Sequence, residues 1–111
     1  MKYFVTDNER EGTCYHEFYR GKWDGYTFWK EDSLSIHDDI MVEHEGFPDA
    51  IKEIVTRYDS AGETEISFDE WIEIGKIIQQ KDETSQAIYH EADEWLKDVF
   101  KTNGCFTILG I

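Results

Sequence analysis

The chain has 111 residues, a length that suits a single domain spanning residues 1–111 with one hydrophobic core. Asp and Glu number 25 against 11 Lys and Arg, so the formal net charge is −14 at pH 7. Such a charge repels nucleic acid phosphates and anionic membranes, which argues against direct binding to either, and it attracts basic proteins or cations.

Other features of the sequence exclude further classes of protein. Aromatic residues make up 15% of the chain, which argues against disorder. No apolar stretch approaches the ~18 residues of a membrane span, and residues 1–7 lack the apolar run of a secretory signal. Cys14 and Cys105 stand far apart and lack the spacing of a zinc site. We therefore predict a cytoplasmic protein whose two thiols are reduced and largely buried in a sheet.

The first 40 residues are predicted to form strands, because aromatic and β-branched residues alternate with short polar turns. The expected strands cover residues 2–6, 13–23, 26–29 and 33–36. Asp24-Gly25 stands between two aromatic runs, a pattern typical of a tight β-hairpin turn. Residues 37–46 are expected to be an acidic connection.

The middle and end of the chain are predicted to hold about three helices. The first begins near Pro48 and ends near Asp59. A capping box at Ser67–Glu70 begins the second, and the third runs from about Thr84 to Lys101 with apolar residues at helical spacing.

Two further strands complete the predicted fold. A short strand is expected at residues 63–66, and the apolar segment 105–111 is expected to be buried, in mid-sheet. The order of elements predicts an α+β domain: a mostly antiparallel sheet of the N-terminal strands and the C-terminal strand, with the helices packed on one face.

One segment is similar to the calcium loop of an EF-hand. In residues 59–70, Asp59 matches the first ligand, Ile66 the hydrophobic eighth position and Glu70 the bidentate twelfth, so Asp59, Glu63 and Glu70 are candidate metal ligands. Ala61 stands where an oxygen ligand belongs, and Thr64 replaces the glycine of the sharp turn. A helix, a turn and a capped helix explain the same residues, so no bound metal or other cofactor is expected.

Catalysis has little support in the sequence. A nucleophile elbow, a phosphate-binding loop and a dinucleotide fingerprint are all lacking, so a non-enzymatic protein is expected. His37-Asp38-Asp39 and Glu43-His44-Glu45 carry groups that bind transition metals, but an acidic loop accounts for them as well.

Three groups of residues are candidates for contact with a partner. Glu91, Glu94 and Asp98 form an acidic stripe beside the apolar face of the last helix. Asp38, Asp39, Glu43 and Glu45 form a second acidic surface. Trp23, Tyr26 and Trp29 could supply an aromatic hot spot.

Two segments, Tyr26–Ile36 and Cys105–Ile111, resemble those of small bacterial proteins. Small size, acidity and the lack of catalytic motifs are also similar to two groups of inhibitors: immunity proteins that neutralise toxic nucleases, and nucleic acid mimics such as antirestriction and anti-CRISPR proteins. The resemblance implies a stoichiometric inhibitor of a basic protein partner, whose acidic side chains cover the site where phosphates bind. A metal-responsive module using residues 59–70, and an acidity that serves only solubility, are the alternatives.

Overall fold

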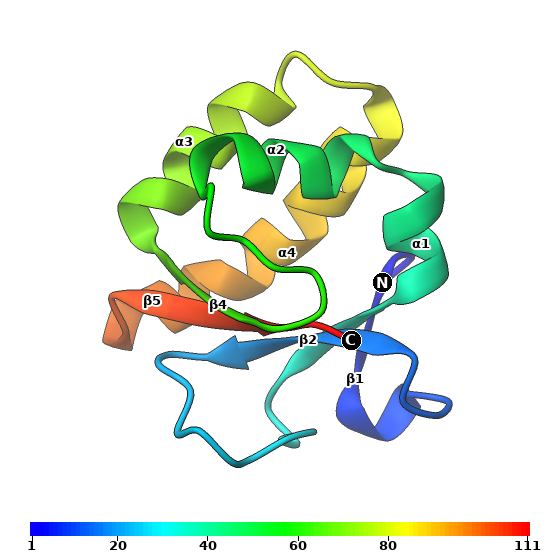
Figure 1. Cartoon of the computed structure of the whole chain (residues 1–111), viewed down its shortest axis with the longest axis vertical. Helices are drawn as coiled ribbons and strands as arrows, with labels where there is room; N and C mark the ends of the chain where they lie inside the picture. The colour runs from blue at the N-terminus through cyan, green and yellow to red at the C-terminus, as the bar shows by residue number, and fades with distance from the viewer.

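Five antiparallel strands form a single sheet in the computed structural model, which describes residues 1–111 (Figure 1). The strands are β1 (Phe4–Thr6), β2 (Tyr15–Arg20), β3 (Leu34–His37), β4 (Glu63–Ser67) and β5 (Cys105–Leu109). Their order across the sheet is β1-β3-β2-β5-β4, so β5 lies inside the sheet and joins β2 to β4. This confirms the prediction that the C-terminal segment is a buried interior strand.

Four α-helices cover one face of the sheet (Figure 1). They are α1 (Asp38–Glu43), α2 (Gly46–Ile54), α3 (Phe68–Ile78) and α4 (Glu83–Thr102), and a short 3₁₀ helix, η1 (Asp7–Glu9), follows β1. The predicted α+β class, with helices packed on one side of a mostly antiparallel sheet, is confirmed.

The hydrophobic core lies between the sheet and the helices. Phe18 of β2 stacks on Phe106 of β5 with ring centroids 5.3 Å apart, and Trp71 of α3 meets Phe106 edge-on at 5.4 Å. Trp71 also stacks on Tyr89 of α4, and its indole N–H donates to the Asp93 carboxylate at 2.9 Å. Large rings from four elements therefore pack the two layers together.

The opposite face of the sheet is covered by the loop of residues 21–33 (Figure 1). Glu17 projects from β2 into this second layer, where it is 1% exposed. Its carboxylate accepts hydrogen bonds from the backbone N–H groups of Trp29 at 2.7 Å and Lys30 at 3.0 Å, and from the Ser33 hydroxyl at 2.6 Å. One buried carboxylate thus holds the loop against the sheet.

The predicted hairpin at Asp24-Gly25 is wrong, and so is the predicted strand at residues 26–29. β2 pairs with β3, and the connection between them is the irregular loop. The carboxylate of Asp24 accepts from the backbone N–H groups of Tyr26 and Thr27, so Asp24 forms a local turn of its own. The N–H groups of Trp29 and Lys30 bind Glu17 instead of a neighbouring strand.

Two helix predictions also need correction. Residues 38–43, expected as part of an acidic connection, form α1: the His37 ring accepts from the Asp39 N–H, and Asp38 and Asp39 fall in the first turn, where carboxylates stabilise a helix. The helix containing Pro48 ends at Ile54, because Val55 is its C-cap and Tyr58 follows in a turn. Figure 1 shows both helices beside the start of α4.

The predicted strand at residues 13–23 is shorter in the structure, where β2 covers Tyr15–Arg20, and the other elements lie close to their predicted positions. The Ser67–Glu70 capping box begins α3, with the Ser67 hydroxyl accepting from the Glu70 N–H at 3.1 Å. Helix α4 exceeds its predicted limits by one residue at each end. None of the helices is long and apolar enough to cross a membrane.

Candidate protein-binding surfaces

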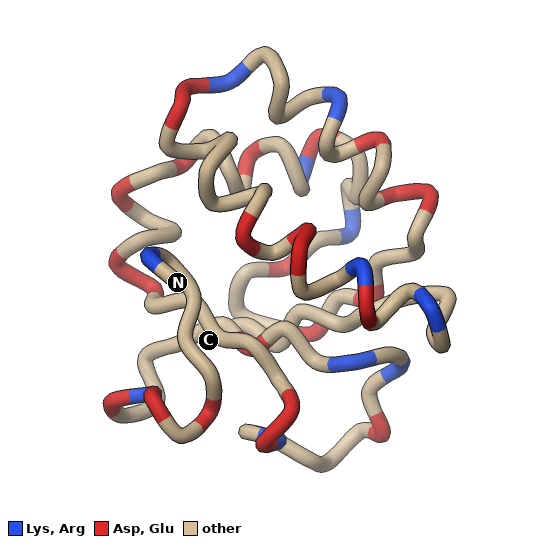
Figure 2. Tube along the Cα trace, turned by 180° about the vertical axis from the view of Figure 1, so that it is seen from behind, with Lys and Arg blue, Asp and Glu red and all other residues tan.

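One corner of the molecule gathers exposed carboxylates from three helices. We call it the acidic corner: Asp39 and Glu43 of α1, Glu45 before α2, and Asp82 and Glu83 at the start of α4. Gly46 lies directly against the side chains of Asp82 and Ser85, so the start of α2 touches the start of α4. In Figure 2, red segments follow α1 and the start of α4 on the same side of the molecule.

The acidic corner is almost free of counter-charges. The His37 ring is the only basic side chain with a nitrogen within 4.0 Å of the Asp39 carboxylate, at 3.7 Å. No Lys, Arg or His nitrogen lies within 4.0 Å of the carboxylates of Glu43, Glu45, Asp82 and Glu83. Hydrogen bonds from the hydroxyl and the N–H of Ser85 lower the pKa of Asp82, which keeps this carboxyl ionised. The corner therefore presents a concentrated negative field to solvent.

Helix stability explains part of the acidic corner. Asp39, Asp82 and Glu83 lie at helix N-termini, where carboxylates are favourable. Glu43 lies at the C-terminal end of α1, where the helix dipole disfavours a carboxylate by roughly 0.3–1 kcal/mol and no basic residue offsets it. The structure therefore gives no stabilising reason for Glu43.

The three residues of the predicted acidic stripe on α4 each have a different partner within the molecule. The Glu91 carboxylate accepts from the backbone N–H groups of Lys2, Tyr3 and Phe4 at 2.9–3.1 Å, so it anchors the start of β1. Glu94 pairs with Lys97 at 2.8 Å, and Asp98 pairs with Arg20 at 2.9 Å. Glu94 and Asp98 stay exposed, but both charges have intramolecular partners.

The predicted aromatic residues have different environments within the loop of residues 21–33. Trp29 is half-buried beneath the Arg10 guanidinium, which lies 3.9 Å from the ring centroid. The Trp23 indole N–H donates to the Thr27 carbonyl at 2.6 Å, and its ring packs against Phe28 at 5.3 Å. Tyr26 is 78% exposed and Phe28 is 55% exposed. Phe28 was not predicted as a contact residue, because its exposure depends on the shape of the loop.

A hollow of about 320 Å³ lies between this loop and the edge of the sheet. We call it the aromatic hollow. Trp23 and Phe28 line one side, and Leu109, Gly110 and the turn at Gly62 line the other, with Glu63 beside them. Hydrogen bonds from the Gly110 N–H to Gly62 and from the Ile111 N–H to Ser60 hold the second side in place.

The segment similar to an EF-hand loop has another architecture. Asp59 caps a turn by accepting from the Ala61 N–H at 2.9 Å, and Glu63 lies on the edge strand β4. The Glu70 carboxylate accepts from the two terminal guanidinium nitrogens of Arg57 and from the Ser67 N–H. Glu70 therefore acts in a helix cap. Nowhere in the molecule do three or more His, Cys, Asp or Glu side chains form a group that could hold a metal ion.

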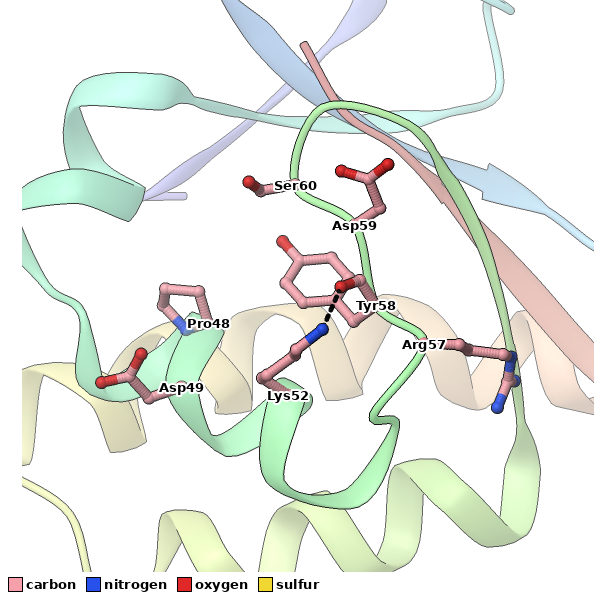
Figure 3. Close-up of a pocket in the computed structure, with 7 residues that line it drawn as sticks. All are labelled: Pro48, Asp49, Lys52, Arg57, Tyr58, Asp59 and Ser60. Carbon is pink, nitrogen blue, oxygen red and sulfur yellow. Dashed lines mark hydrogen bonds between the residues drawn. The ribbon is translucent and has the colours of Figure 1, made fainter.

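Figure 3 shows a shallow hollow beside this segment, where residues of α2 face Arg57–Ser60. The Lys52 ammonium is bound by the carbonyls of Thr56 and Tyr58, and Arg57 points to Glu70, so both cations have partners. Burial raises the pKa of Tyr58 to about 12, which keeps its hydroxyl neutral.

Both thiols are free, as predicted, but the expected burial of Cys14 is wrong. Cys14 is exposed just before β2, and Cys105 is half-buried at the start of β5. Burial raises the pKa of the Cys105 thiol, which keeps it in its unreactive protonated form. His16, 2% exposed, meets the Asp38 carboxylate at 2.7 Å, so Asp38 is tied to the sheet instead of standing free for a partner.

Sequence analysis missed two members of the acidic corner, Asp82 and Glu83. They are distant in sequence from residues 39–45, and only the packing of α2 against α4 brings them together. The pair Asp82-Glu83 could be recognised from the sequence only as the start of a helix.

Comparison of the chain with protein family models, with curated proteins and with solved structures gave no match. The proposals below therefore rest on the surface of the molecule itself.

Proposed function

We propose that this protein is a non-enzymatic inhibitor that binds a basic protein partner through its acidic corner. The partner is a nuclease-type toxin or another enzyme that binds nucleic acid, and the carboxylates of the corner cover the groups that normally bind phosphates. The observation that carries the proposal is the group of exposed carboxylates that form no ion pair with a Lys or Arg within 4.0 Å, in a chain of net charge −14.

Geometry and charge support this choice over the stripe on α4. The acidic corner combines carboxylates from α1, from the start of α2 and from the start of α4, whereas Glu91 is bound by backbone N–H groups and Glu94 and Asp98 have ion-pair partners. Unpaired carboxylates give up no internal ion pair when a Lys or Arg side chain binds them. They also attract a basic partner over the ~8–10 Å across which salt screens charges at physiological ionic strength.

The test compares two variants of equal charge. Glu43→Lys with Glu45→Lys changes the acidic corner, and Glu94→Lys with Asp98→Lys changes α4; each pair of reversals moves the net charge from −14 to −10. The immobilised wild-type protein is used to capture a basic protein from the source cells, and the captured protein is purified. We expect the association rate of the wild type to fall about tenfold or more with added salt. The corner variant should associate more slowly than the α4 variant and should respond less to salt.

Inhibition is measured on the purified partner as loss of nucleic acid cleavage or binding. The proposal fails if no basic protein is captured, if the captured protein keeps its activity in the complex, or if both variants bind it as well as the wild type does.

A further inference from the structure

We infer that the aromatic hollow binds the guanidinium group of an arginine side chain from another polypeptide. The hollow is lined by Trp23 and Phe28 of the loop of residues 21–33, which covers the face of the sheet opposite the helices (Figure 1), so the hollow lies on that face. It is thus a second site, separate from the acidic corner, and the inference does not depend on the proposed function.

The size and lining of the hollow suit one long side chain. Its volume of about 320 Å³ is at the low end of the range of about 300–1,000 Å³ for small-molecule sites. Trp23 and Phe28 line it with aromatic rings, and Leu109 adds an apolar side chain beside which the methylene groups of an arginine can lie. The rings of Phe28 and Tyr26 are exposed, and contact of their apolar surface with water is unfavourable unless a partner covers them.

The charge at the hollow selects a cation. Glu63 is exposed at the hollow and has no cation within 4.0 Å, and the carboxylate of Asp59 lies against Gly62 on the neighbouring turn. A guanidinium group can stack on an aromatic ring and donate two parallel hydrogen bonds to one carboxylate, which an ammonium group cannot do. The molecule already contains such a contact on the same face, where Arg10 stacks on Trp29 at 3.9 Å.

Lys22 is a cation of the chain itself that lies near the same carboxylate. It lies in the adjoining hollow, which shares Trp23 and Glu63 with the aromatic hollow and adds Glu65. Removing the charge of Lys22 therefore leaves Glu63 more strongly negative, whereas neutralising Glu65 changes the adjoining hollow alone.

The test uses single amino acids as probes: the N-acetyl amides of arginine, lysine and citrulline, the last a neutral analogue of arginine with the same shape. Each is titrated into the protein while NMR follows the Trp23 indole N–H and the Phe28 ring. We expect saturable shifts with arginine, weaker ones with lysine and none with citrulline.

Three variants decide the role of charge without disturbing the loop. Glu63→Gln should weaken arginine binding by about two- to fivefold, Lys22→Gln should strengthen it, and Glu65→Gln serves as the matched control with a smaller effect. Equal shifts with arginine and citrulline, or binding unchanged by Glu63→Gln, would overturn the inference. Because this test needs no protein partner, its result does not depend on whether the acidic corner binds and inhibits a basic protein.

Discussion

Glu17 connects two layers of the molecule that no strand pairing joins. Its carboxylate is 1% exposed and accepts three hydrogen bonds from the loop of residues 21–33. The loop also contains Trp29 with a φ of +60°, a conformation that costs a non-glycine residue of order 1–3 kcal/mol. The bonds to Glu17 and the Arg10 guanidinium above the ring offset this cost.

We expect Glu17→Leu to destabilise the protein by several kcal/mol, because a buried donor left without a partner costs about 1–3 kcal/mol and Glu17 serves three. Urea denaturation followed by circular dichroism measures the loss in the free energy of unfolding. Glu31→Leu in the same loop is the control, since Glu31 is exposed and has no ion pair, and its effect should stay within about 0.5 kcal/mol. Equal effects of the two changes would show that Glu17 does not hold the loop.

The sequence predicted those helices that are stabilised by contacts between residues close together in the chain. The apolar spacing of α4 and the Ser67–Glu70 cap depend on residues within a turn or two of one another, and both are present. The irregular loop depends on Glu17, which binds N–H groups 12 and 13 residues further along the chain. Neither that contact nor the meeting of Asp82 with Gly46 leaves a periodic pattern in the sequence.

The cap of α3 is also tied to the preceding turn. The hydrogen bond from Arg57 is the main cause that lowers the pKa of Glu70 below its ordinary value of 4.5, and the hydrogen bond from the Ser67 N–H adds to it. A carboxyl whose pKa is lower in the folded state stabilises the protein above about pH 4.5, and this contribution disappears as the pH falls through the folded pKa.

Glu70→Gln should therefore lower the free energy of unfolding at pH 7 and flatten its decline below pH 4.5. Gln keeps the capping box, because its amide can still accept from the Ser67 N–H, so the change isolates the charge. Urea unfolding at pH 7, 5, 4 and 3 gives the profile. Glu73→Gln is the matched control on the same helix, where both Glu73 and Lys76 are exposed. A profile as steep as that of the wild type would refute the assignment.

For the whole molecule, the excess of carboxylates produces self-repulsion. The charge of −14 is spread over a body of 34 × 28 × 24 Å. At about 10 mM salt the screening length is about 30 Å, comparable to the molecule, and at about 0.15 M it is about 8 Å. Distant carboxylates therefore repel one another at low salt and hardly at all at physiological ionic strength.

We expect the melting temperature to rise when NaCl is increased from about 10 mM to about 150 mM, because relief of repulsion outweighs the weakening of the exposed ion pairs. Circular dichroism at the two salt concentrations measures it. The variant Glu43→Lys with Glu45→Lys should be more stable than the wild type at low salt and should respond less to added salt. A wild-type melting temperature that falls with salt would contradict this account.

The interior position of β5 sets a limit on when the protein can fold during its synthesis. On the ribosome, β1, β2 and β3 can pair as soon as residue 37 has emerged, but β4 joins them only through residues 105–109. Until then the nascent chain carries an open edge on β2 and an apolar sheet face without α4 above it. Arg20 and Phe106 pair across β2 and β5 although they are far apart along the chain. Bringing them together costs chain entropy before any packing energy is gained, which makes this step slow. Completion of the sheet is therefore delayed until residues 105–109 have been made, and the unfinished chain exposes the surfaces that chaperones bind.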